Sequence, residues 1–169
     1  LFPYTTLFRS VSPLCNGVAA PNLYIRFSDD DARLPVMSRD GGLVMVPWGV
    51  HHGDYGNPMP KGPCARLESI KSGRWQRYNP RPVRIAVDRF SERSPVDRCT
   101  YWFQMPEGLV LQGLFAPPSP MMPMGCVYVV TVPLETALQY PITPQGALPA
   151  GGMAAVHDRW PRLIPLSAD

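Results

Sequence analysis

The sequence lacks any apolar run approaching the roughly 20 residues that a membrane-spanning helix needs, which argues against a membrane protein. Charged residues are also scarce, at 17% of the chain, whereas hydrophobic residues reach 45%. This balance is typical of a globular protein and excludes a disordered one. Among 16 basic residues only two are lysines, Lys61 and Lys71. Arginine-rich usage of this kind can also reflect a GC-rich genome.

Paired cysteines are absent as well. Cys15, Cys64, Cys99 and Cys126 show no CxxC spacing, so the sequence does not predict a zinc site. The adjacent His51 and His52 would point to opposite faces of an extended chain, which does not favour a shared metal, and we expect them at the surface. A disulfide framework is not expected in a cytoplasmic chain of this size. Each cysteine is therefore expected to be a small buried hydrophobe or an individually reactive thiol.

The N-terminus lacks the features of a secretory signal. Its only early charge, Arg9, follows the apolar residues, and no A-x-A-like cleavage site comes after it. Residues 1–10 read LFPYTTLFRS, which resembles the translation of a common short-read sequencing adapter. We therefore interpret residues 1–10 as a translated artefact, residues 11–13 as upstream read-through, and residues 14–169 as one domain.

The remaining sequence contains many short strand-like runs and little helical signal. Val-, Tyr-, Phe- and Trp-rich segments bounded by Gly or Pro predict strands at 42–48, 83–90, 100–105, 108–116 and 126–132. The sequence MPEG (105–108) predicts a tight hairpin, and short helical turns are expected around 65–71 and 134–140. Loops are expected at 116–125 and 141–153. These features predict a single mainly β (α+β) domain of short, mostly antiparallel strands with a few short helices.

Positive charge gathers in one part of the sequence. Residues 66–98 hold eight arginines and one lysine against four acidic residues, an excess of five positive charges. Such a segment would suit the phosphate backbone of a nucleic acid. A solvated face with scattered ion pairs would have the same composition.

Four short motifs occur in a fixed order, namely PWGVHHG (47–53), CARLES (64–69), VDRFSER (87–93) and HDRWP (157–161). They are similar, respectively, to a Trp-Gly motif ending an early strand, Asn-Ala-Arg-x-Glu-Thr, Ala-Asp-Gly-Phe-Tyr-Glu-Trp and His-Asp-Arg-Met-Pro. Together with LQGLFA (111–116) and VYVVTV (127–132), they resemble the SOS response-associated peptidase family, the abasic-site processing proteins. The resemblance covers roughly residues 14–164.

The resemblance implies an N-terminal cysteine. Members typically begin Met-Cys, and LCNG at 14–17 fits if Leu14 comes from an alternative start codon and is then removed. An α-amine and a thiol on one residue can capture the aldehyde of an abasic site as a thiazolidine. With fourteen residues before it, Cys15 has only an amide nitrogen, and this reaction would be closed to it.

The same resemblance implies roles for other residues. Glu92 would orient the amine and shuttle protons, and His157 would assist sugar opening, which suits an imidazole that titrates near 6.5. Arg66 and Arg159 would contact phosphates or fix the site, and Trp48 would stack near an unpaired base.

Without the family pattern these residues would have ordinary structural interpretations. Trp48 would be a core residue, Glu92 a solvated acid at a strand end, and His157 a satisfied loop histidine. Three positions depart from the pattern: Cys64 replaces Asn, Gly17 replaces Arg, and Arg93 replaces Trp. These departures are typical of a divergent subgroup.

The resemblance thus implies a DNA-damage response enzyme that covalently traps abasic sites in single-stranded DNA through Cys15. Two alternatives remain open, a thiol peptidase that includes self-processing before Cys15, and a non-covalent DNA-binding module with a decayed site. The expected partner of the protein is single-stranded DNA that contains abasic sites. We expect it to bind no membrane and to need no metal or cofactor. We expect a monomer in the bacterial cytoplasm, associated with the nucleoid.

Overall fold

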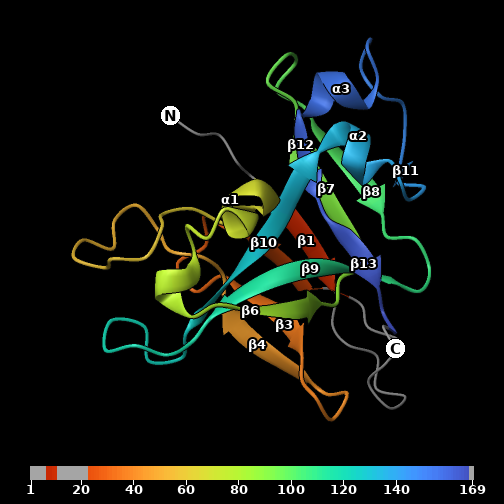
Figure 1. The fold of residues 1–169 in the computed structure, drawn as a ribbon. Helices are drawn as coiled ribbons and strands as arrows, with labels where there is room; N and C mark the ends of the chain where they lie inside the picture. The colour runs from red at the N-terminus through yellow and green to blue at the C-terminus, as the bar shows by residue number, and fades with distance from the viewer. Residues whose placement is uncertain (1–6, 11–22, 168–169) are drawn as a thin grey trace.

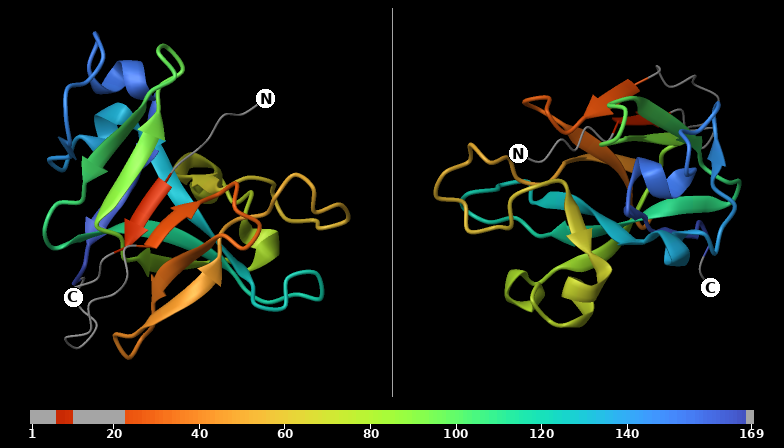
Figure 2. Two further views of the ribbon diagram at one scale, coloured as in Figure 1. Left: turned by 180° about the vertical axis from the view of Figure 1, so that it is seen from behind. Right: turned by 90° about the horizontal axis from the view of Figure 1, so that it is seen from above.

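The computed structural model describes residues 7–10 and 23–167, and most of its regular structure is strand arranged in two sheets (Figure 1). Sheet A has five strands, in the spatial order β11 (Thr143–Pro144), β8 (Thr100–Gln104), β7 (Arg89–Arg93), β1 (Leu7–Ser10) and β2 (Leu23–Arg26). Its neighbouring strands are all antiparallel. Figure 2 shows β7, β8, β1 and β2 side by side from behind.

Sheet B is the larger sheet, and its main path has six strands. These are β12 (Arg159–Pro161), β10 (Cys126–Pro133), β9 (Leu109–Ala116), β6 (Arg81–Ile85), β3 (Arg33–Met37) and β4 (Leu43–Pro47). Off this path, β13 (Leu163–Pro165) pairs with β9, and β5 (Cys64–Arg66) pairs with β10 in the parallel direction.

Helices are few and short: α1 (Leu67–Lys71), the 3₁₀ turn η1 (Gln76–Tyr78), α2 (Leu134–Ala137) and α3 (Met153–Val156). The prediction of a mainly β, α+β fold with short helices is confirmed. Among the residues the structure describes, no helix is both long enough and apolar enough to cross a membrane.

The main core lies between the two sheets. Phe90 and Phe103 from sheet A pack with rings 5.4 Å apart, and Trp160 from sheet B meets Phe103 edge-on at 4.8 Å. Leu34 and Ile85 add fully buried aliphatic side chains from sheet B. A second apolar cluster on the opposite face of sheet B includes Leu114, Tyr128, Val130 and Trp75. Because both faces of β10 are covered, its residues from Cys126 to Val132 are all buried.

Two sequence-based predictions fail at the same place. The run 83–90 is not one strand, because the chain leaves sheet B after Ile85 and enters sheet A at Arg89. The segment 105–108 is not a hairpin either, since it joins β8 of sheet A to β9 of sheet B, which do not pair. The two crossings touch: the Asp88 carbonyl accepts hydrogen bonds from the Met105 N–H at 2.8 Å and from Gln104 Nε2 at 3.0 Å.

Residues 1–10, interpreted from the sequence as an artefact, contribute strand β1. It lies between β7 and β2, with Phe8 opposite Phe90 on one side and Ile25 on the other. The origin of this segment stays a prediction. In this chain it nevertheless supplies backbone pairing to the strand that carries Glu92.

Candidate functional site

A cavity of about 280 Å³ brings together residues from six separate parts of the chain. It is lined by Phe27, His52, Lys61, Gly62, Pro63, Cys64, Arg66, Glu92, Thr131, His157 and Arg159. Four of the residues predicted from the sequence are among them: Glu92, His157, Arg66 and Arg159. They come from β7, from the turn after α3, from β5 and from β12.

Glu92 is a buried acid, with only 6% of its surface exposed. It lies on the same face of β7 as Phe90, because alternate residues of a strand share a face, and this face turns toward the core. Carboxylates are rarely this buried unless they have a role or a partner. The alternative interpretation of Glu92 as a solvated acid at a strand end is therefore wrong.

Cys64 lies in the same cavity and stays a thiol rather than a thiolate. Burial raises the pKa of Cys64 far above its usual range, and the negative charge of Glu92 raises it further. Arg159 acts in the opposite direction without offsetting burial. Where the family pattern has an amide, this site therefore offers a neutral and weakly polar group.

His157 is held as a neutral imidazole. Its Nδ1 accepts a hydrogen bond from the Arg159 N–H at 2.9 Å, so the proton of the neutral ring lies on Nε2. Nδ1 also lies 3.2 Å from Asp158 Oδ1, which would favour the charged ring. Burial has the larger effect and lowers the pKa of His157 below 6.5. We favour the neutral form, because Asp158 is 89% exposed and water screens it. The expected titration near 6.5 is therefore corrected downward.

Arg159 is fixed by partners inside the protein. Its Nη2 donates to Glu68 Oε2 at 2.8 Å and to the Thr131 carbonyl at 2.9 Å. Such a guanidinium is held in one orientation. Of the two roles predicted for Arg159, this geometry favours fixing the site.

Arg66 differs from Arg159. It is exposed at the cavity edge, and the structure gives its guanidinium no hydrogen-bond partner among the described residues. It is therefore the better placed of the two to meet a ligand phosphate.

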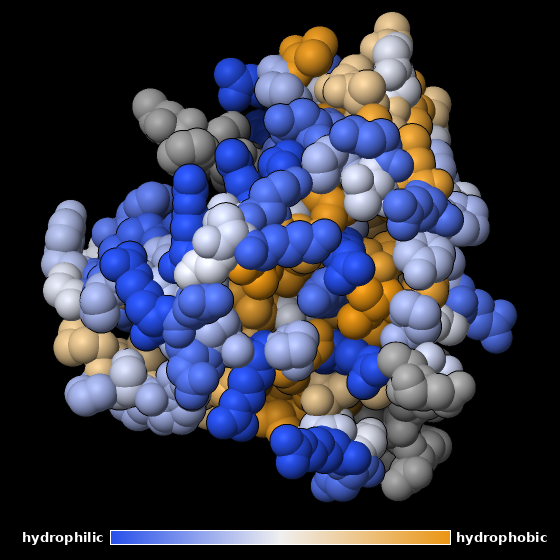
Figure 3. Space-filling view, in the orientation of Figure 1, coloured by the Kyte–Doolittle hydropathy of each residue, from blue (hydrophilic) through white to orange (hydrophobic). Residues whose placement is uncertain are grey.

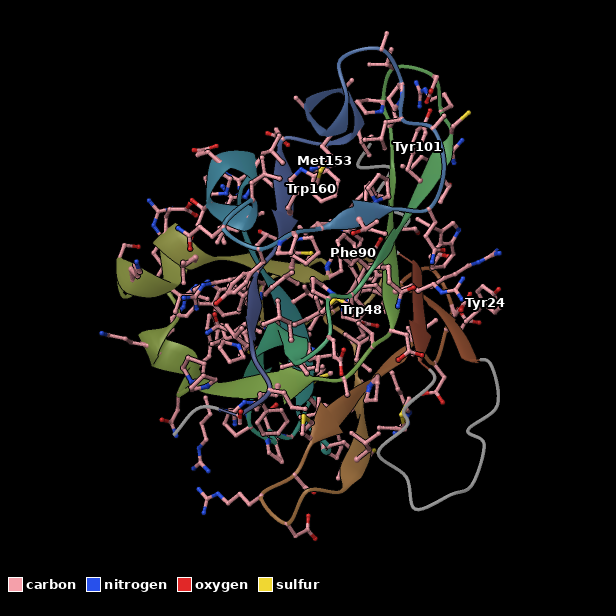
Figure 4. The ribbon with its side chains drawn as sticks, turned by 90° about the vertical axis from the view of Figure 1, so that its right-hand side faces the viewer. Tyr24, Trp48, Phe90, Tyr101, Met153 and Trp160 are labelled. Atoms are coloured by element: carbon pink, nitrogen blue, oxygen red, sulfur yellow. The ribbon has the colours of Figure 1, made fainter. Side chains whose placement is uncertain are left out.

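The prediction for Trp48 is not supported by its position. Its side chain is 1% exposed, its Nε1 donates to the Pro63 carbonyl at 2.9 Å, and it meets Phe27 edge-on at 5.4 Å. Figure 4 shows Trp48 in the interior of the fold, in contrast to Tyr24, which points outward. Because both faces of the indole are covered by protein, Trp48 cannot stack on a base and acts as a core residue.

The Trp-Gly motif instead shapes the backbone beside the cavity. Gly49 has φ +62°, and a Cβ there would lie 2.3 Å from the Gly62 carbonyl oxygen. Val50 and Gly62 exchange two backbone hydrogen bonds, of 2.8 and 3.3 Å. This close approach closes the loop between Val50 and Gly62 and carries the chain on to Cys64.

Some cavity residues were missed by sequence reasoning. Thr131 was hidden in an apolar strand. Lys61 belongs to no motif, and its Nζ donates to the carbonyls of Asp54 and Asn57 at 2.6 and 3.1 Å. His52 is exposed, as expected, but His51 is half-buried and stacks on Phe27 at 4.4 Å.

Other predictions have mixed outcomes. Cys15 and Gly17 lie outside the described residues. Cys126 is a buried hydrophobe, and burial raises its pKa to about 11, whereas Cys99 is exposed. Within the described part of the chain, no group of three or more His, Cys, Asp or Glu side chains could hold a metal ion.

Comparison with known proteins gives no further assignment. No protein-family model matches the chain. A search of curated proteins and a search of solved structures also find no match.

Proposed function

We propose that this protein captures abasic sites in single-stranded DNA through Cys15. The observation that supports the proposal is the convergence of Glu92, His157, Arg66 and Arg159, which come from distant motifs, on one cavity. A volume of about 280 Å³ lies just below the usual range of pockets for drug-sized ligands and suits a smaller group, one sugar without its base.

The proposed chemistry forms two bonds and releases one water. The free α-amine of Cys15 attacks the C1′ aldehyde of the open sugar, and the resulting carbinolamine loses water to give an imine. The Cys15 thiol then adds across the C=N bond, with sulfur bonding to carbon and the thiol proton passing to nitrogen. An α-amine suits the first step because its pKa lies near 8, which leaves a useful neutral fraction at pH 7.

Four cavity residues would assist this reaction in different ways. His157, neutral with its proton on Nε2, would donate a hydrogen bond to the ring oxygen as the sugar opens. Glu92 would accept the proton released by the amine and return it to the departing hydroxyl. Arg66 would hold a flanking phosphate, and Arg159 would keep α1 and β10 in place through Glu68 and Thr131.

The described thiols are poor candidates for the nucleophile of a peptidase. The thiolate is the reactive form, and burial raises the pKa of both Cys64 and Cys126. Cys99 is exposed but does not line the cavity. Among the four cysteines, Cys15 is therefore the nucleophile that we propose.

The test uses protein that begins at Cys15, with its folding checked by circular dichroism. It is mixed with a single-stranded oligonucleotide carrying one abasic site, and the products are separated on a denaturing gel and weighed intact. We expect an adduct with the mass of protein plus DNA minus one water. Cys15→Ser should abolish it, whereas Cys99→Ser, the matched control, should not.

Glu92→Gln should slow adduct formation by about 100-fold, as expected for loss of a general acid–base, and Glu107→Gln in an exposed loop should have no effect. Absence of any adduct from folded protein would contradict the proposal. Salt-sensitive oligonucleotide binding without an adduct would instead identify a non-covalent DNA-binding module.

A further inference from the structure

A second polar cluster lies on the outer face of sheet B, away from the cavity. Arg84 on β6 is directly opposite Gln112 on β9. Arg162, between β12 and β13, donates a hydrogen bond from Nη1 to Gln112 Oε1. None of these three residues lines the cavity of the candidate site.

The direction of Arg84 follows from the strand alternation. Its neighbours Val83 and Ile85 point to the main core, where their side chains fill the space beside Gly113. Arg84 therefore points to the opposite face, which it shares with Gln112 and Leu114. Figure 3 shows this side of the molecule, where hydrophilic side chains cross a hollow with apolar atoms at its floor.

The cluster contains donors and positive charge but no acid. The Nε of Arg84 is buried and has no hydrogen-bond partner among the residues that the structure describes. None of the ion pairs among the described residues involves Arg84 or Arg162. The acceptor of the cluster, Gln112 Oε1, already accepts a hydrogen bond from Arg162. The amide N–H groups of Gln112 are further donors.

Two guanidinium groups beside one neutral amide repel each other, and a buried N–H without a partner costs free energy. An oxyanion held by the terminal Nη groups of the two arginines offsets this repulsion, because it accepts several hydrogen bonds and carries the opposite charge. We propose that Arg84, Gln112 and Arg162 form a binding site for a phosphate group. The group is either a free phosphate ion or a phosphodiester of a nucleic acid strand.

The first test measures thermal unfolding of the full chain in phosphate and in chloride at matched ionic strength. A phosphate concentration ten times the dissociation constant should raise Tm by about 3–6 °C above the chloride value. Arg84→Gln and Arg162→Gln should lose this difference. Arg74→Gln removes the same charge from an exposed arginine outside the cluster and should keep it.

A variant that does not weaken the fold guards against misfolding as an explanation. Gln112→Glu places a carboxylate between the two guanidinium groups, so the protein should be at least as stable without phosphate. It should no longer respond to phosphate, because the charge is already neutralised. A phosphate response that persists in Gln112→Glu and Arg84→Gln, or one that chloride reproduces in the unaltered protein, would overturn the proposal.

A second measurement identifies the source of the phosphate. Binding of a single-stranded oligothymidylate without abasic sites is followed as salt is raised. If the phosphodiester is the ligand, Arg84→Gln and Arg162→Gln should each weaken binding and reduce the salt slope by about one. If free phosphate is the ligand, oligonucleotide binding stays unchanged while the phosphate-specific rise in Tm is lost. Neither measurement depends on Cys15 or on the cavity.

Discussion

Gly49 provides the sharpest test of how the backbone builds the cavity wall. Gly49→Ala can be compared with Gly56→Ala, because both glycines have positive φ, +62° and +85°, and belong to the same part of the chain. A Cβ at Gly56 would meet nothing within 4 Å, whereas at Gly49 it would lie 2.3 Å from the Gly62 oxygen. The pair therefore separates the cost of the left-handed conformation from the cost of the clash.

The expected magnitudes follow from these contacts. The left-handed conformation costs alanine about 1–2 kcal/mol, offset by about 0.4–1 kcal/mol from the less flexible unfolded chain. Gly56→Ala should therefore lose about 1 kcal/mol. In Gly49→Ala the Gly62 oxygen must retreat by about 1 Å to reach ordinary contact. That movement strains the two hydrogen bonds between Val50 and Gly62 and the 2.8 Å bond from the Gly49 N–H to the Val127 carbonyl.

At about 1 kcal/mol for each hydrogen bond, Gly49→Ala should lose about 3–4 kcal/mol of unfolding free energy in total. Urea unfolding followed by tryptophan fluorescence measures both variants against the unaltered chain. Losses that agree within about 1 kcal/mol would show that the loop yields to the new methyl group, and would refute this account of the Trp-Gly motif.

Three further predictions concern charge and reactivity. Because burial lowers the pKa of His157 below 6.5, the unfolded chain takes up that proton at a higher pH than the folded chain. The unfolding free energy should therefore fall as pH drops below about 6.5. In a pH series of urea titrations, His157→Gln should flatten that fall. Arg159→Gln should lower the unfolding free energy by about 1–3 kcal/mol, because it also removes the hydrogen bond to the Thr131 carbonyl. Glu68→Gln should lower it by less than about 1 kcal/mol, since Glu68 is 57% exposed. Equal losses for the two variants in thermal unfolding would contradict this order. Iodoacetamide at pH 8 should modify exposed Cys99 at least about tenfold faster than Cys64 or Cys126, whose pKa values burial raises, as peptide mass mapping would reveal.

The sequence predicted individual strands better than it predicted the sheets they join. Strands β4, β8, β9 and β10 form where β-branched and aromatic residues gather between Gly and Pro. The alternation of apolar residues, however, runs on from Val83 and Ile85 to Val87, although the chain has already left sheet B after Ile85. That change depends on long-range pairing with β9 and β8, for which no local pattern exists.

The candidate site could be predicted where a motif fixed both residue type and order. Glu92, His157, Arg66 and Arg159 were all placed this way, and all line the cavity. Trp48 shows the limit of the method, because a tryptophan beside a site and a tryptophan beneath it look alike in sequence. The tautomer of His157 depends on a backbone N–H two residues away and has no sequence signal.

The position of β1 changes what removal of the N-terminal segment would mean. Since β1 lies between β7 and β2, a chain cut before Cys15 would be a complex of two pieces, held together by strand pairing. Departure of the short piece would leave β7 and β2 with unpaired backbone groups, a state prone to recruiting another strand. An excess of the free peptide would cover these strands again without restoring the peptide bond before Cys15, so strand coverage and the covalent cut can be separated.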